Sequence, residues 1–109
     1  MIIVIFEFEI NPTEDQNYFD LANGLKQELQ KIDGFISVSR FVDMETPNTF
    51  VSISRWKDQT AVERWQKHSG HIIAQEKGQN FIFKDYRISV ASVIRDYTLN
   101  KKKSRRTSG

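Results

Sequence analysis

The first ten residues, MIIVIFEFEI, constrain the fold more than any other segment of this 109-residue chain. β-branched and aromatic side chains dominate the segment, which is typical of a β-strand. Its first half is apolar on both faces, whereas Glu7 and Glu9 begin an alternation of polar and apolar residues. A strand that is apolar on both faces belongs in the middle of a sheet whose two faces are covered. We therefore expect residues 1–10 to form a central strand.

The segment after this strand has the spacing of an amphipathic helix. Apolar residues return every three or four positions from Tyr18 to Ile32, and Asp33-Gly34 is a typical helix end. Two segments with period-2 alternation follow, over residues 35–43 and 49–56, and the turn-forming sequence METPN separates them. We expect a helix and then two strands.

A second helix is predicted after Asp58, which can cap it, and Gly70 is expected to interrupt this helix before a further turn at 72–77. The alternation over residues 81–97 predicts one long final strand. The predicted order is β-α-β-β-α-β, the ferredoxin-like α+β arrangement with an antiparallel sheet. One face of that sheet should carry both helices.

The other sheet face is predicted to be aromatic. The alternation assigns to it Phe35, Phe41, Phe50, Trp56 and Tyr97. An exposed apolar face of this kind marks an interaction surface. We therefore expect a homodimer in which two sheets face each other and close an α+β barrel.

Small hydroxylated residues are predicted to share this face. They are Ser37, Ser39, Ser52, Ser54 and Ser89. Small side chains would leave volume between the two sheets for a small molecule. The alternative is that these serines simply occupy a solvated sheet face.

Charge is distributed unevenly along the chain. Of its 16 Lys and Arg residues, five lie in the last nine positions, namely Lys101, Lys102, Lys103, Arg105 and Arg106, while the chain holds 14 Asp and Glu. We expect a folded domain over residues 1–99 and a disordered basic tail over 100–109. The body has no basic stripe, so nucleic-acid binding is not expected.

Other function classes are excluded by what the sequence lacks. No apolar run approaches the roughly 20 residues that a membrane span requires, so no membrane partner is expected. The chain has no cysteine, which removes disulfides, thiolate metal sites and cysteine nucleophiles. Glycine-rich nucleotide-binding motifs are also missing. A cytoplasmic protein is the remaining expectation.

Several segments together resemble the antibiotic biosynthesis monooxygenase family of dimeric α+β barrel proteins. They are the IIVIFEFEI strand, Gly34-Phe35, SRWKDQTAVERWQKHSGH at 54–71 and YRISVASVIRDY at 86–97. The resemblance covers residues 1–97. It implies a small monooxygenase that oxidises an electron-rich aromatic, quinol- or polyketide-like substrate without metal, flavin or any other cofactor. We expect the substrate pocket to lie between sheet and helices.

The family's site residues match this chain only in part. Trp56 stands where quinone-forming members have a tryptophan, whereas Ser52 and Val62 stand at the positions of an asparagine and a tyrosine. A non-catalytic small-molecule-binding dimer of the same fold is therefore the alternative. Trp65 matches a tryptophan of haem-degrading relatives, but Gln75 replaces their histidine ligand, so haem degradation is not expected.

The predicted catalytic residues are a base and a cation. His71 is predicted to take the phenolic proton, because an imidazole titrates near neutrality. Arg87 is predicted to stabilise the resulting anion, ahead of Arg40 and Arg95. The alternative is that Arg87 and Arg95 pair with Glu7 and Glu9 on the first strand.

The remaining predicted site residues surround the substrate. Trp56 is predicted to stack on its ring, and the other binding residues are Ser52, Trp65, Phe50 and Ser39. No metal site is predicted, because His68 and His71 lack a third ligand at suitable spacing.

Overall fold

A computed structural model describes residues 1–75 and 82–99, with side chains for residues 1–70 and 82–99. The chain runs through β1 (Ile2–Ile10), a 3-10 turn η1 (Pro12–Glu14), α1 (Asp15–Leu29), β2 (Phe35–Val42), β3 (Thr49–Trp56), α2 (Gln59–Gln75) and β4 (Phe83–Ser92). The predicted ferredoxin-like order is confirmed. The predicted basic tail, 100–109, lies outside the described residues.

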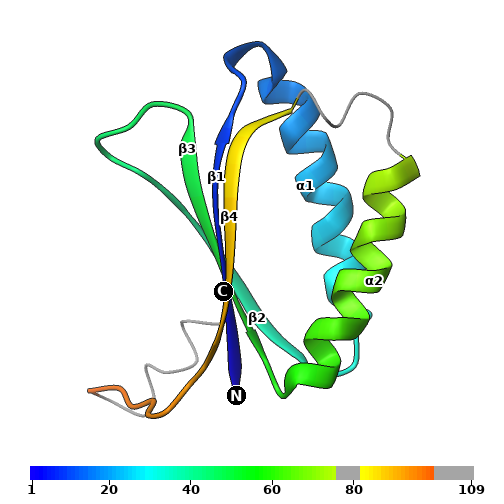
Figure 1. Cartoon of the computed structure of the whole chain (residues 1–109), viewed down its shortest axis with the longest axis vertical. Helices are drawn as coiled ribbons and strands as arrows, with labels where there is room; N and C mark the ends of the chain where they lie inside the picture. Colours follow the sequence, from blue (N-terminus) through cyan, green and yellow to red (C-terminus); the bar gives the residue numbers. More distant parts are fainter. Residues whose placement is uncertain (76–81, 100–109) are drawn as a thin grey trace.

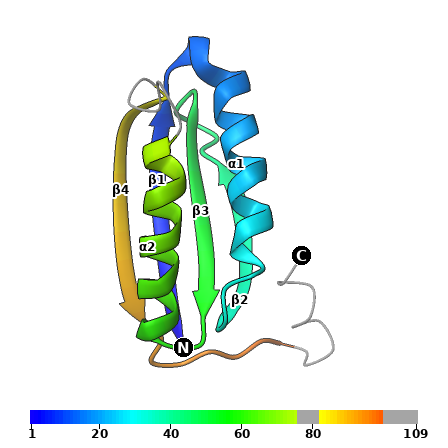
Figure 2. The ribbon, with the colours of Figure 1, turned by 90° about the vertical axis from the view of Figure 1, so that its right-hand side faces the viewer.

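The strands form one antiparallel sheet in the order β2-β3-β1-β4. β1 is central, as its apolar sequence predicts, and pairs with both β3 and β4. Figure 1 shows α1 and α2 on the same side of this sheet, and Figure 2 shows the two helices lying in front of the strands. The other face carries no helix of residues 1–75 or 82–99. Within the described residues, no helix is long and apolar enough to cross a membrane.

The strand register decides which side chains face the helices. In antiparallel pairs, residues directly opposite each other point to the same face. Phe8 of β1 is opposite Phe50 and Tyr86, and Ile2 is opposite Trp56. Since Phe8 and Trp56 are buried in the core, this whole set faces the helices.

The prediction of an aromatic outer face is therefore wrong for most of its members. Phe50 and Trp56 lie on the helix face of β3. Phe35 joins them because a bulge between Phe35 and Ser37 shifts the alternation of β2 by one residue. Only Phe41 of the strand aromatics lies on the outer face, opposite Val51 and half-exposed.

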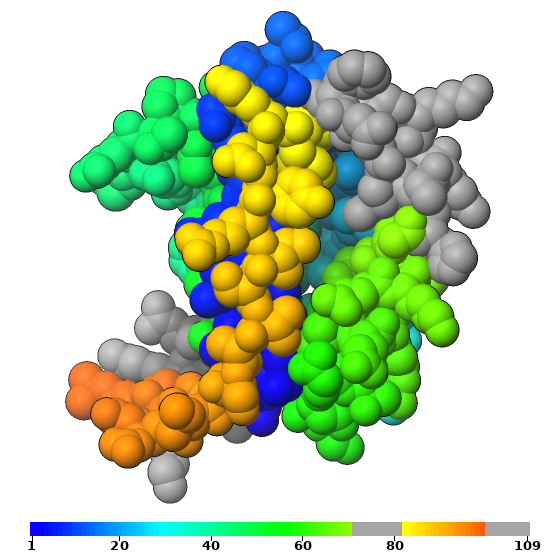
Figure 3. Space-filling view, viewed as in Figure 1, coloured from blue at the N-terminus to red at the C-terminus, as the bar shows by residue number. Residues whose placement is uncertain are grey.

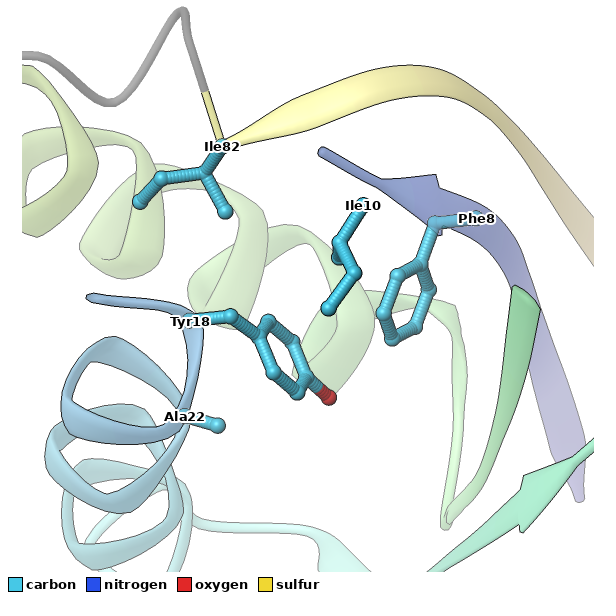
Figure 4. Packing of buried hydrophobic residues seen from close by; sticks show 5 residues of the cluster. All are labelled: Phe8, Ile10, Tyr18, Ala22 and Ile82. Atoms are coloured by element: carbon cyan, nitrogen blue, oxygen red, sulfur yellow. The ribbon is translucent and has the colours of Figure 1, made fainter. Parts of the chain in front are cut away.

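The core between sheet and helices consists of two clusters. The first comprises Phe8, Ile10, Tyr18, Ala22 and Ile82, and Figure 4 shows the Tyr18 ring reaching from α1 toward Phe8. The second comprises Leu29, Trp56, Ala61 and Val62. The helical repeat predicted from the sequence thus directs α1 into both clusters.

Helix α2 begins as predicted, but it is not interrupted at Gly70. The Ala61 backbone N–H donates to Asp58 Oδ1 at 2.9 Å, which caps the helix. The helix runs through Gly70 to Gln75, so the expected interruption is wrong. The cost of one glycine in a helix, about 1 kcal/mol, is too small to break it.

Strand β4 is shorter than the predicted strand 81–97. It ends at Ser92, which pairs with Ile2 at the start of β1. Beyond Ser92, the Val93 backbone N–H donates to the Met1 carbonyl oxygen at 3.0 Å, next to the first residue of β1. The segment 93–99 leaves the sheet, with Ile94, Tyr97 and Leu99 exposed.

Candidate functional site

A cavity of about 210 Å³ lies between the helix face of the sheet and the two helices. Residues of both core clusters contribute to it. Its lining residues are Val4, Phe6, Phe8, Tyr18, Leu21, Ala22, Leu25, Leu29, Val38, Arg40, Ser52, Ser54, Val62, Trp65, Gln66, Ser69, Phe83 and Ile88. Most of this wall is aliphatic or aromatic, as is usual for pockets that bind organic molecules.

Each element supplies one row of the wall. Helix α2 contributes Val62, Trp65, Gln66 and Ser69, which recur at the three- and four-residue spacing of one helix face. Strands β1, β2 and β3 contribute alternate residues. In Figure 3 the surface is hollowed between β4 and α2. Ile88 of β4 lines the cavity and is half-exposed.

Two polar groups stand out on the wall. Tyr18 is 6% exposed, and burial raises the pKa of its phenol while the positive charge of Arg40 opposes that rise. The phenol is therefore protonated at neutral pH and can donate a hydrogen bond. The Arg40 guanidinium contacts the Ala22 carbonyl oxygen, with Nη2 at 3.5 Å.

Ser52 and Trp65 are the two predicted binding residues that line the cavity. Trp56 does not: it is fully buried, its ring packs against Phe35 and Trp65, and its indole N–H donates to Ser54 Oγ at 2.9 Å. Phe50 packs on Phe8 and Tyr18 in the core. The structure therefore places both residues behind the cavity wall.

The predicted cation lies on the other side of the sheet. Arg87 is opposite Glu7, on the outer face, which agrees with the pairing alternative. Arg95 has no such partner, because Glu9 is opposite Asp85 and Arg95 follows the end of β4. Ser39 is also on the outer face, opposite Ile53. None of these three residues lines the cavity.

The predicted base, His71, is the first residue of α2 whose side chain the structure does not describe. The His71 backbone belongs to α2, and its side chain is outside the described residues. His68 is described: its Nε2 lies 3.1 Å from Glu28 Oε1 and joins α2 to α1. Hydrogen bonds from Lys31 and His68 lower the pKa of Glu28, so this carboxyl is ionised at neutral pH.

The sequence did not predict Tyr18 as a site residue, and it ranked Arg40 below Arg87 as the candidate cation. The signal for Arg40 was present: it alternates with Val38 and Val42, so a cation shares a strand face with two valines. Tyr18 carries no such signal, because an aromatic residue at helical spacing is typical of a core position.

The family follows from comparison with known proteins. A model of the antibiotic biosynthesis monooxygenase family matches residues 1–77. The chain belongs to this family, which confirms the resemblance found in the sequence.

Two relatives differ in how much of their length the chain covers. It is 35% identical over 103 residues to "Jasmonate monooxygenase ABM" of Pyricularia oryzae, covering 94% of this chain and 48% of that protein. It is 27% identical over 92 residues to the uncharacterized protein YqjZ of Bacillus subtilis, covering 84% of this chain and 78% of that protein. The chain thus spans about half the length of the first relative.

Solved structures share the fold. Rv0793 from Mycobacterium tuberculosis has a TM-score of 0.74 at 15% identity, with 89% of this chain and 98% of that chain covered. SnoaB, a cofactor-independent oxygenase from Streptomyces nogalater, has a TM-score of 0.73 at 13% identity, with 92% and 97% covered. At these identities the likeness defines the architecture.

Proposed function

We propose that this chain is a cofactor-independent monooxygenase that oxidises a small, electron-rich aromatic substrate in the cavity between sheet and helices. The observation that carries the proposal is the cavity itself, with an apolar wall and a few polar groups. Membership of a monooxygenase family supports it. So do the names of two similar proteins, a jasmonate monooxygenase and a cofactor-independent oxygenase.

The chemistry needs a substrate that gives a stabilised carbanion on losing a proton. Oxygen then adds to the carbanion carbon, and loss of water from the hydroperoxide leaves a carbonyl, so that a CH₂ group and O₂ become C=O and H₂O. The protein's part is to orient the substrate, exclude water and stabilise the anion. The apolar wall suits the first two tasks.

The test is oxygen consumption by the purified chain with a panel of anthrones and hydroquinones, in the presence of EDTA. Jasmonate joins the panel because a relative is named for it. From an accepted anthrone or hydroquinone we expect one quinone-type product for each O₂ consumed, above the spontaneous rate. No enzyme-dependent uptake with any compound would contradict the proposal.

The base remains a prediction. If His71 takes the substrate proton, His71→Ala should lower turnover by about 10²–10⁴-fold while folding is nearly unchanged. The cavity-lining residues of α2 recur every three or four positions, at Val62, Trp65, Gln66 and Ser69. This spacing would next reach residues 72 and 73, not residue 71. His68→Ala is the matched control. Full turnover in His71→Ala would exclude His71 as the base.

A non-catalytic binding module is the second candidate, and one observation favours it. Among the described residues, the cavity lining contains no carboxylate and no imidazole. A protein that only binds its ligand needs neither. This candidate predicts tight binding of an aromatic compound without oxygen consumption, which the same panel detects.

We further propose that two copies pair through the helix-free face of the sheet. This face holds Phe41, Val51, Ile53, Ile3 and Ile5. In Figure 1 the segment after β4 extends to this same side of the sheet, away from the helices, and three large apolar side chains of that segment are exposed. A second copy of the chain would cover both the helix-free sheet face and the exposed side chains of this segment.

The dimer proposal has a closely matched control. Phe41 on the outer face and Phe19 on α1 are each 51% exposed. Light scattering after size exclusion should give twice the chain mass for the unsubstituted protein and for Phe19→Glu, and a lower mass for Phe41→Glu. A stable monomer at micromolar concentration would contradict the proposal.

A further inference from the structure

Arg40 is a cation in an apolar row. On β2 it alternates with Val38 and Val42, it lies opposite Ser52, and all four residues are on the helix face of the sheet. Arg40 lines the cavity together with Val38 and Ser52. Arg40 is exposed and Val42 is 65% exposed, so the Arg40 guanidinium can be reached from solvent as well as from the cavity.

Arg40 also lacks an internal counter-charge. Within residues 1–70 and 82–99, no carboxylate lies within ion-pair distance of its guanidinium. Its contact with the Ala22 carbonyl oxygen is long, at 3.5 Å. A guanidinium has five N–H donors in a planar fork, so most of its donor capacity is unused by these residues.

Tyr18 supplies a second unused donor nearby. Its side chain is buried, and its hydroxyl forms no hydrogen bond with another described residue. A buried hydroxyl without a partner costs free energy, and such groups are usually satisfied by water or a ligand. Arg40 contacts the carbonyl oxygen of Ala22, which lies one helical turn after Tyr18 on α1, and all three residues line the cavity. The Arg40 guanidinium and the Tyr18 hydroxyl therefore belong to one region of the cavity wall.

We propose that this cavity selects a small apolar acid, whose carboxylate is bound by Arg40 and Tyr18 and whose hydrocarbon part packs against the apolar wall. The proposal rests on the proposed function's assignment of this cavity as the substrate site. One guanidinium matches a carboxylate in charge and in its two-pronged geometry. The cavity volume, about 210 Å³, is below the range usual for drug-sized ligands and calls for a small molecule.

The test compares an acid with its neutral isostere. Titration calorimetry without oxygen measures binding of 4-phenylbutyrate and of 4-phenylbutyramide to the intact chain. We expect the acid to bind about 10- to 100-fold more tightly than the amide, because hydrogen bonds to a charged group are stronger than neutral ones. Arg40→Met should abolish this difference by weakening acid binding alone. Tyr18→Phe should reduce the difference without abolishing it.

Lys26→Met, which removes an exposed cation from α1, is the matched control and should leave both affinities unchanged. Equal affinity for acid and amide, an equal loss of both in Arg40→Met, or no binding of either compound would overturn the proposal. Its failure is distinguishable from failure of the oxygenase proposal. Acid selectivity without oxygen consumption contradicts only the oxygenase, whereas oxygen consumption by a chain that binds the acid and the amide equally contradicts only the acid site.

Discussion

Replacing Trp56 by alanine is expected to lower the free energy of unfolding by about 3–5 kcal/mol. The side chain is fully buried, and its ring packs against Phe35 and Trp65. Removing it also leaves the Ser54 hydroxyl without the indole donor that it accepts from. A domain of this size has about 5–15 kcal/mol of stability in total, so much of it would be lost. Urea unfolding at a fixed protein concentration measures the change.

Trp65→Ala is the matched control, because Trp65 is only half-buried and lines the cavity. It should cost clearly less stability than Trp56→Ala and should weaken ligand binding more. The reverse pattern, with Trp56→Ala folding normally and losing only binding, would restore the original prediction that Trp56 stacks on the substrate.

Filling the cavity is expected to remove activity while the fold survives. Ala22 is on α1, 8% exposed, and lines the cavity beside Tyr18. A leucine there would occupy volume that the substrate needs and would displace it from the polar groups. Ala22→Leu should therefore lower turnover about 10²-fold or more, the effect expected when a substrate is displaced by about 1 Å. Its cost in stability should stay within about 1–3 kcal/mol.

Asn23→Leu is the control, because it adds the same side chain at the next position of α1, which is exposed. It should keep full turnover. Retention of full turnover in Ala22→Leu, with binding unchanged, would show that substrate does not occupy this cavity. Circular dichroism of both variants checks that the helices remain.

The sequence was sufficient to predict the order of the elements and the central place of β1. Period-2 and helical spacing are local signals in the sequence. The apolar residues on both faces of β1 predict that it is a central strand. The alternation in β3 was also read correctly. It separates Phe50, Ser52, Ser54 and Trp56 from Val51 and Ile53, as the register confirms.

Which of the two sets faces the helices could not be read from β3 alone. Both sets are apolar enough to be buried, so the choice depends on tertiary packing. The bulge after Phe35 added a second error, because it places Phe35 on the helix face, whereas Ser37, Ser39 and Phe41 lie on the outer face as their alternation predicted. Because β3 was assigned to the wrong face, Ser52 and Ser54, which were predicted to face a second sheet, line the cavity between sheet and helices. Ser39 and Arg87 lie on the outer face.

The position of a bound substrate tests the central claim most directly. A crystal structure of the chain with an aromatic compound from the panel should place the aromatic ring between the helices and the sheet, in contact with Trp65 and Ser52. A ring bound on the outer face, between two facing sheets and against Ser39 or Arg87, would contradict the claim and return the site to the dimer interior.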